Sequence, residues 1–266
     1  MRGERLKLFQ ADAVLQHGLI QELAIMKKLV LAFTISLFLL LNAFAQGDQG
    51  TQNLEEWTTY YYNNPEPDKI APVLKVITDR GYFENDNVQA PLSGFFTEVF
   101  IANPERISAW VKPYIGIPKR HILYSALWTC NSAQCRAALE QMAKAESPQE
   151  AKKISALLAS PPPTIESMSI NNPAALDYLW GRFMASGSAA PVERIIDQMK
   201  LASSKENVDA VLIGGAAQWS VLANARQHKK VLEILEIRRN NADPQTKALL
   251  NEILASINAE NINNVR

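Results

Sequence analysis

The chain has 266 residues, with 27 basic and 27 acidic side chains and a formal net charge of zero. Residues 1–45 hold five of the basic and three of the acidic side chains, so residues 46–266 carry 22 and 24 and are weakly acidic. This balance excludes the strongly basic surfaces typical of proteins that bind nucleic acid or anionic lipid. Glycine is scarce and alternating strand-like runs are few, which favours an all-α fold.

Residues 26–45, MKKLVLAFTISLFLLLNAFA, have the order of a secretory signal peptide. Two lysines precede an apolar run without charge, and Ala43-Phe44-Ala45 places small residues at the positions that signal peptidase reads. A membrane-spanning helix needs about 20 apolar residues, and this run is shorter. We therefore expect the signal peptide to be cleaved and the rest of the chain to be exported, to the periplasm or as a secreted protein. An uncleaved N-terminal anchor is the alternative.

Residues 1–25 precede a signal peptide that has its own methionine, Met26. We interpret them as a mis-assigned upstream start, and a long positive region before the apolar run is the alternative. Residues 46–53 and 259–266 are polar, and we expect them to be a flexible leader and a frayed tail. The folded part of the chain is then predicted to lie between residues 54 and 258.

Helix starts recur along this folded part. Ser147-Pro148-Gln149-Glu150 is a capping box, with proline at the first helical position, where its missing N–H costs little. The same order of cap and proline occurs at Asn103-Pro104, Asn172-Pro173 and Asp243-Pro244. Apolar residues between these starts repeat every three or four positions. The pattern predicts about eleven short antiparallel helices in an α-solenoid-like array or a bundle.

One proline-rich stretch interrupts the helical pattern. Residues 160–172, SPPPTIESMSINN, have no helical stripe, and consecutive prolines favour an extended backbone. The stretch divides an N-terminal helical half, residues 54–159, from a C-terminal half, residues 173–258. It is either a linker between the halves or a strap packed across them, in which case Met168 and Ile170 would be buried.

Two segments resemble each other. In GRFMASGSAAPVERIIDQM and AQWSVLANARQHKKVLEIL, a bulky residue (Phe183 or Trp219) precedes a cluster of small residues and then an apolar stripe. The segments resemble tetratricopeptide-like helical hairpins, and a non-repetitive bundle is the alternative. PLSGFFTEVFIANPERI and LDYLWGRFMASGSAAPVERIID are similar to a group of uncharacterised exported bacterial α-helical proteins. That resemblance implies an exported helical domain and no particular chemistry.

The chain has two cysteines, Cys130 and Cys135. An exported protein meets an oxidising compartment, so we expect a disulfide. In an unbroken helix this separation would place the Cα atoms about 8 Å apart, too far for a bridge. A turn at Asn131-Ser132 would bring the pair together.

Templates for catalysis and metal binding are absent from the sequence. There is no G-x-S-x-G elbow, no H-E-x-x-H and no phosphate-binding glycine loop. Downstream of residue 45 the histidines are His121 and His228, too few for a zinc site with the cysteine pair. We expect no catalytic residue, no metal and no cofactor. Gly214-Gly215 lies within a helical stripe, and we expect these glycines to permit close helix packing.

The candidate binding residues are aromatic or basic. Trp57, Tyr60 and Tyr61 share one helix face and would bind peptide or sugar if exposed, although burial in the core is the alternative. Lys119, Arg120 and His121 form a small positive cluster that would attract an anionic partner. We therefore expect a non-catalytic scaffold that binds a protein or peptide in the cell envelope. An envelope hydrolase or lyase, and a small-ligand or lipid carrier, are the alternatives.

Overall fold

The computed structural model describes residues 56–117, 119–205 and 207–264, with side chains as far as residue 260. Within these residues the protein is all-α and has no strand, as the composition predicts. The predicted upstream segment 1–25, signal peptide 26–45 and flexible leader 46–53 lie outside the described residues. The chain from Trp57 onward forms one compact unit. None of its described helices is both long enough and apolar enough to cross a membrane.

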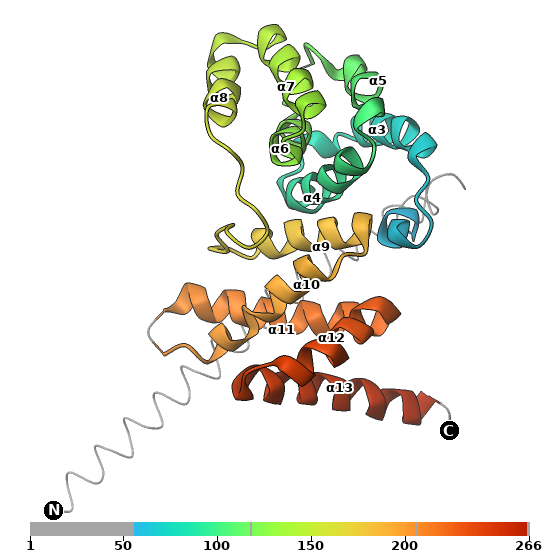
Figure 1. The fold of residues 1–266 in the computed structure, drawn as a ribbon, viewed down its shortest axis with the longest axis vertical. Helices are drawn as coiled ribbons and strands as arrows, with labels where there is room; N and C mark the ends of the chain where they lie inside the picture. The colour runs from blue at the N-terminus through green and yellow to red at the C-terminus, as the bar shows by residue number, and fades with distance from the viewer. Residues whose placement is uncertain (1–55, 118, 206, 265–266) are drawn as a thin grey trace, which may run out of the picture. The chain divides into compact units, whose positions relative to one another are not determined.

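Figure 1 shows the course of the helices. Residues 56–59 are helical. The α-helices that follow are α3 (Ile70–Asp79), α4 (Asp86–Ala102), α5 (Ile107–Val111), α6 (His121–Cys130), α7 (Ala133–Ala145), α8 (Pro148–Leu158), α9 (Ala174–Ser186), α10 (Ala189–Ile196), α11 (Val208–Gln227), α12 (Lys229–Asn241) and α13 (Pro244–Asn264). Short 3-10 helices connect them: η1 (Tyr61–Asn63), η2 (Pro67–Lys69), η3 (Tyr82–Glu84), η4 (Pro104–Arg106), η5 (Lys112–Tyr114) and η6 (Met199–Ser203).

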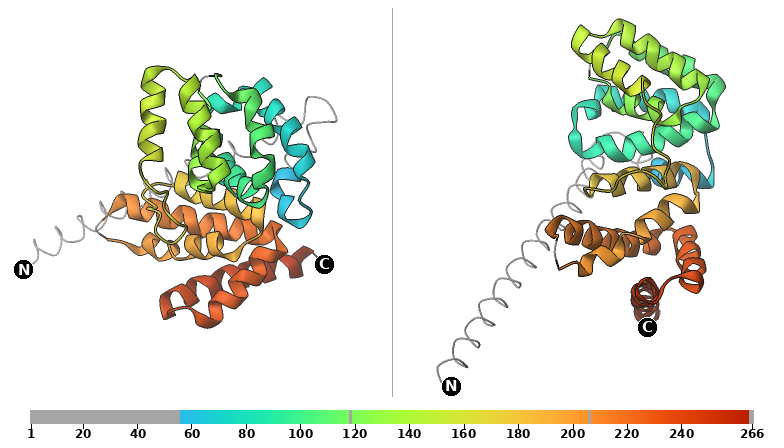
Figure 2. Two further views of the ribbon diagram at one scale, coloured as in Figure 1. Left: turned by 45° about the horizontal axis from the view of Figure 1, so that its top comes forward. Right: turned by 60° about the vertical axis from the view of Figure 1, so that its left-hand side comes forward.

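Most helices pack on their neighbours in sequence. Helix α8 packs on α7, α7 on α6, and α6 on α4, while beyond α9 the contacts pass through α10, α11 and α12 to α13 (Figure 2). The most extensive contact between elements distant in sequence joins α4 to α9, and η1 also contacts α9. Because each helix buries one apolar face against the next, the series continues without a sheet or a central helix.

Two glycines allow α4 and α9 to cross at backbone contact. A Cβ atom added to Gly94 would lie 2.0 Å from the carbonyl oxygen of Tyr178, and one added to Gly181 would lie 1.9 Å from that of Pro91. No side chain fits between the two backbones at this point. An ion pair between Arg182 and Glu98 flanks the crossing and is largely buried.

Helix caps explain where many of the helices begin. The hydroxyl of Ser147 accepts a hydrogen bond from the Glu150 amide at 3.4 Å, and a carboxylate oxygen of Asp243 accepts from the Thr246 amide at 3.1 Å. Both caps confirm the sequence prediction. Asn103 differs, because its side chain donates to the carbonyl of Val99 at the end of α4 and makes no cap for η4.

The proline-rich stretch 160–172 lies against the C-terminal helices. Ile165, Met168 and Ile170 are partly buried against the core of that half, and Arg194 donates a hydrogen bond to the carbonyl oxygen of Met168 at 3.2 Å. This is the packing that the strap interpretation expects. At the other end, α13 continues to Asn264, into the segment that the sequence analysis assigns to the tail.

Candidate functional site

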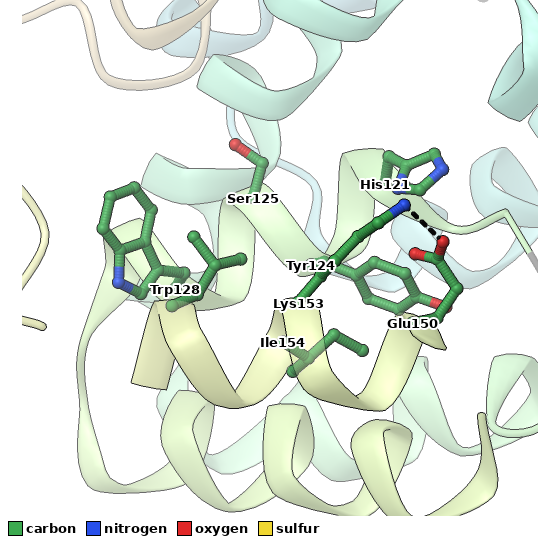
Figure 3. Close-up of a pocket in the computed structure, with 8 residues that line it drawn as sticks. His121, Tyr124, Ser125, Trp128, Glu150, Lys153 and Ile154 are labelled. Carbon is green, nitrogen blue, oxygen red and sulfur yellow. Dashed lines mark hydrogen bonds and ion pairs between the residues drawn. The ribbon is translucent and has the colours of Figure 1, made fainter. Parts of the chain in front are cut away.

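A groove between α6 and α8 is the candidate site in the described residues. Each helix contributes side chains at the spacing i, i+3, i+4 and i+7, which places four residues on one face. The groove has a volume of about 340 Å³ and is open to solvent. It is lined by His121, Tyr124, Ser125 and Trp128 of α6 and by Glu150, Lys153, Ile154 and Leu157 of α8 (Figure 3).

The walls of the groove are mainly apolar. Trp128, Ile154 and Leu157 supply apolar side chains, and the ring of Tyr124 adds to this lining. The indole N–H of Trp128 donates to the carbonyl oxygen of Ser160 at 3.1 Å, which orients the ring and joins it to the start of the strap. An apolar wall with one fixed aromatic ring is suited to binding an apolar side chain.

The groove also carries charge. The Lys153 ammonium lies 2.6 Å from a carboxylate oxygen of Glu150, and the Lys153 side chain remains 60% exposed. The hydrogen bond from Lys153 lowers the pKa of the Glu150 carboxyl, against the opposing effect of desolvation, and the charge of His121 adds to the lowering. Glu150 is therefore ionised at neutral pH and is held by its partner.

Tyr124 takes little part in the polar chemistry of the groove. Its hydroxyl donates a hydrogen bond to the Glu146 carboxylate, outside the lining residues. Burial raises the pKa of the Tyr124 phenol, and the Glu146 carboxylate raises it further. The phenol therefore stays protonated, and its ring serves as part of the wall.

Of the predicted aromatic candidates, Tyr61 is buried, and Trp57 and Tyr60 are partly buried. The Trp57 ring contacts the rings of Tyr61 and Phe95, and its N–H donates to Glu66 at 2.9 Å. Tyr61 is 3% exposed. Tyr60 is half-buried and packs against a buried histidine. This packing is what the core interpretation expects.

The predicted basic cluster is divided by the structure. Lys119 is exposed, with a backbone φ of 61°. Arg120 is 6% exposed, and its guanidinium lies over the Phe83 ring at 4.5 Å from the ring centre. Among the six predicted binding residues, His121 alone lines the groove. The sequence predicts one positive cluster, whereas in the structure Lys119 is exposed and Arg120 is buried.

Cys130 and Cys135 form a disulfide in the structure, with their Cα atoms 6.2 Å apart. Helix α6 ends at Cys130, Asn131 adopts the left-handed conformation with φ of 50°, and Ser132 caps α7. The turn that the bridge requires is therefore present.

Sequence reasoning missed Trp128, Lys153 and Leu157 as groove residues. The matched spacing of side chains in residues 121–128 and 150–157 could have indicated two facing helix surfaces. Each of these segments also carries an apolar stripe, and the stripe was interpreted as part of the core.

Sequence reasoning also missed His228, which is 1% exposed and surrounded by Tyr60, Tyr62 and Phe183. Its Nδ1 lies 3.2 Å from the Tyr62 hydroxyl, while its Nε2 is buried without a hydrogen-bond partner. Burial lowers the pKa of the His228 imidazole to about 4.

No group of three ligating side chains suited to a metal ion occurs in the described part of the chain. Comparison of the chain with models of protein families, with curated proteins and with solved structures found no match.

Proposed function

We propose that the protein is a non-catalytic binding protein of the cell envelope that holds a peptide segment of a partner protein in the α6–α8 groove. The observation that carries this proposal is the pair of facing helical stripes, which form a mainly apolar groove with a charged end. A bulky apolar side chain would lie against Trp128 and Leu157. A neighbouring charged group would lie at the Glu150–Lys153 pair. The groove is open to solvent, which suits a peptide better than a lipid, because a lipid carrier needs a closed apolar cavity.

The polar groups of the groove are poorly arranged for hydrolysis. Glu150 is neutralised by Lys153, and its lowered pKa makes it a weak base at neutral pH. Within the described residues, no hydrogen bond joins the Ser125 hydroxyl to His121, so a base-activated serine is not formed. These features favour binding over the alternative of an envelope hydrolase or lyase.

The envelope location is part of the proposal and has two supports. Residues 26–45 have the order of a secretory signal peptide. The disulfide between Cys130 and Cys135 is of the kind that persists in oxidising compartments.

Binding of short capped peptides that differ at one central position tests the function. Isothermal titration should show binding when that position is leucine or phenylalanine, and at least tenfold weaker binding when it is serine. Leu157→Lys should abolish the preference, because it places a charge on the apolar wall. Ile237→Lys is the matched control, since Ile237 is an exposed isoleucine of α12 outside the groove. Equal binding of all peptides, or unchanged binding by Leu157→Lys, would contradict the proposal.

A further inference from the structure

Helix α11 carries an apolar seam that is exposed to solvent along its first three turns. Val208 is 75% exposed, Leu212 38% and Trp219 37%, although all three are large apolar residues. Gly215 lies between them, and a Cβ atom added to it would meet no atom within 4 Å. With steps of four and three residues, the same face includes Val208, Leu212, Gly215, Trp219, Leu222 and Arg226. Leu222 is partly buried against the core, and Arg226 is exposed. This spacing is that of a helix that packs along one side against another helix.

The seam is complementary to itself in the antiparallel direction. When two copies of α11 are placed side by side and reversed, Trp219 of each copy meets Gly215 of the other. In the same register Leu212 meets Leu222, and Val208 meets Arg226. The ring of Trp219 thus faces Gly215, the one position of the seam that lacks a side chain. This contact occurs twice in the dimer, once from each copy, as a two-fold symmetric interface requires.

The charges of α11 support the same register. Its only charged residues are Asp209, near the first turn, and Arg226, in the last turn. Reversing one copy brings each Asp209 next to Arg226 of the other, whereas a parallel pair would bring like charges together. Arg226 also pairs with Glu260 of its own chain, and a guanidinium has further N–H donors for a second carboxylate.

We propose that two copies of this protein associate through antiparallel α11 helices, with Trp219 of each copy packed on Gly215 of the other. The 20 residues of α11 span about 30 Å, so a single pair of helices lies at the small end of specific interfaces. The dimer should therefore dissociate on dilution. This interface is separate from the α6–α8 groove and does not depend on the proposed function.

Sedimentation equilibrium of the protein expressed from its full sequence tests the dimer. The mass should rise from one copy to two as the concentration increases. Trp219→Gly and Gly215→Trp should each weaken association about tenfold, because the first removes the ring and the second fills its site. The double variant exchanges the two residues, restores the pairing and should return to within about threefold of the wild type.

Two further variants keep the result interpretable. Leu212→Glu should prevent association, while Ile101→Glu, at an exposed isoleucine of α4, should leave it unchanged. Circular dichroism establishes that each variant is folded. A wild type that stays monomeric at all concentrations overturns the proposal, as does a dimer insensitive to Leu212→Glu. A double variant as weak as the single ones overturns the antiparallel register and the proposal with it.

Discussion

Gly214 and Gly215 are adjacent in α11, and we predict that replacing them with alanine has opposite effects on stability. A Cβ atom at position 214 would lie 1.9 Å from the backbone nitrogen of Ala202 and 2.5 Å from the carbonyl carbon of Leu201. At position 215 the same atom would meet nothing within 4 Å. The sequence prediction of close packing is thus confirmed for Gly214 and wrong for Gly215.

The magnitudes follow from two contributions. Alanine is favoured over glycine within a helix by up to about 1 kcal/mol, and this gain applies to both positions. At Gly215 nothing opposes it, so Gly215→Ala should raise the free energy of unfolding by about 1 kcal/mol. At Gly214, η6 would have to move away by roughly 1.5 Å to reach normal contact distance. Overpacking costs up to about 3 kcal/mol, and a clash with backbone atoms lies at that end of the range, so Gly214→Ala should lower the free energy of unfolding by about 2 kcal/mol.

Urea unfolding followed by circular dichroism measures both effects, at protein concentrations where the chain is monomeric. The slope of the free energy of unfolding against urea concentration should be the same for the two variants, so the shift in the midpoint concentration of urea reports the change in stability directly. If both substitutions raise stability, η6 does not press on Gly214 as described. If both substitutions lower stability to the same extent, alanine at position 215 does not gain the helix propensity on which the prediction depends.

Three other predictions concern the core. Gly94→Ala should lower the free energy of unfolding by about 2 kcal/mol in the same assay, because its Cβ would meet the backbone of Tyr178 and this cost exceeds the same gain in helix propensity; stability equal to wild type would show that α4 and α9 do not touch. The imidazole of His228 has a folded pKa of about 4, below its usual 6.5, so the unfolded state binds more protons in this range and the contribution of His228 to stability should fall, by up to about 3 kcal/mol, as the pH drops from 6.5 to 4. His228→Gln should lack this contribution, which the difference between its unfolding curves and those of the wild type across that range measures. Burial raises the pKa of Asp177 from 3.8 to about 7, so the folded state binds more protons and the contribution of Asp177, opposite in sign, should fall as the pH rises through this window. Asp177→Asn should remove that fall and be the more stable protein at pH 8, and an unchanged pH profile would refute the burial of its carboxyl.

Local features of the sequence were enough to predict the helices and several of their boundaries. The caps at Ser147 and Asp243 involve residues three positions apart, so the pattern contains all the information that they need. The turn at Asn131 is similarly local. In such cases the chain near a residue decides its conformation.

Exposure depends on partners that the sequence pattern does not identify. Phe183 and Trp219 occupy matching positions in the two similar segments, yet Phe183 is fully buried and Trp219 is 37% exposed. The difference arises because Phe183 packs beside Trp180 and His228, from α9 and the end of α11, whereas no described element covers Trp219. The groove could not be predicted for the same reason, since it exists only because α6 and α8 stand side by side.

The crossing of Gly94 and Gly181 has a consequence for how the protein folds. Between these two residues the chain leaves α4, forms α5 to α8 and the strap, and returns as α9. Closing so long a loop carries an entropic penalty of roughly 4 kcal/mol, while most other helix contacts join neighbours in sequence. We therefore expect the meeting of α4 and α9 to limit the rate of folding, after the local hairpins on either side have formed.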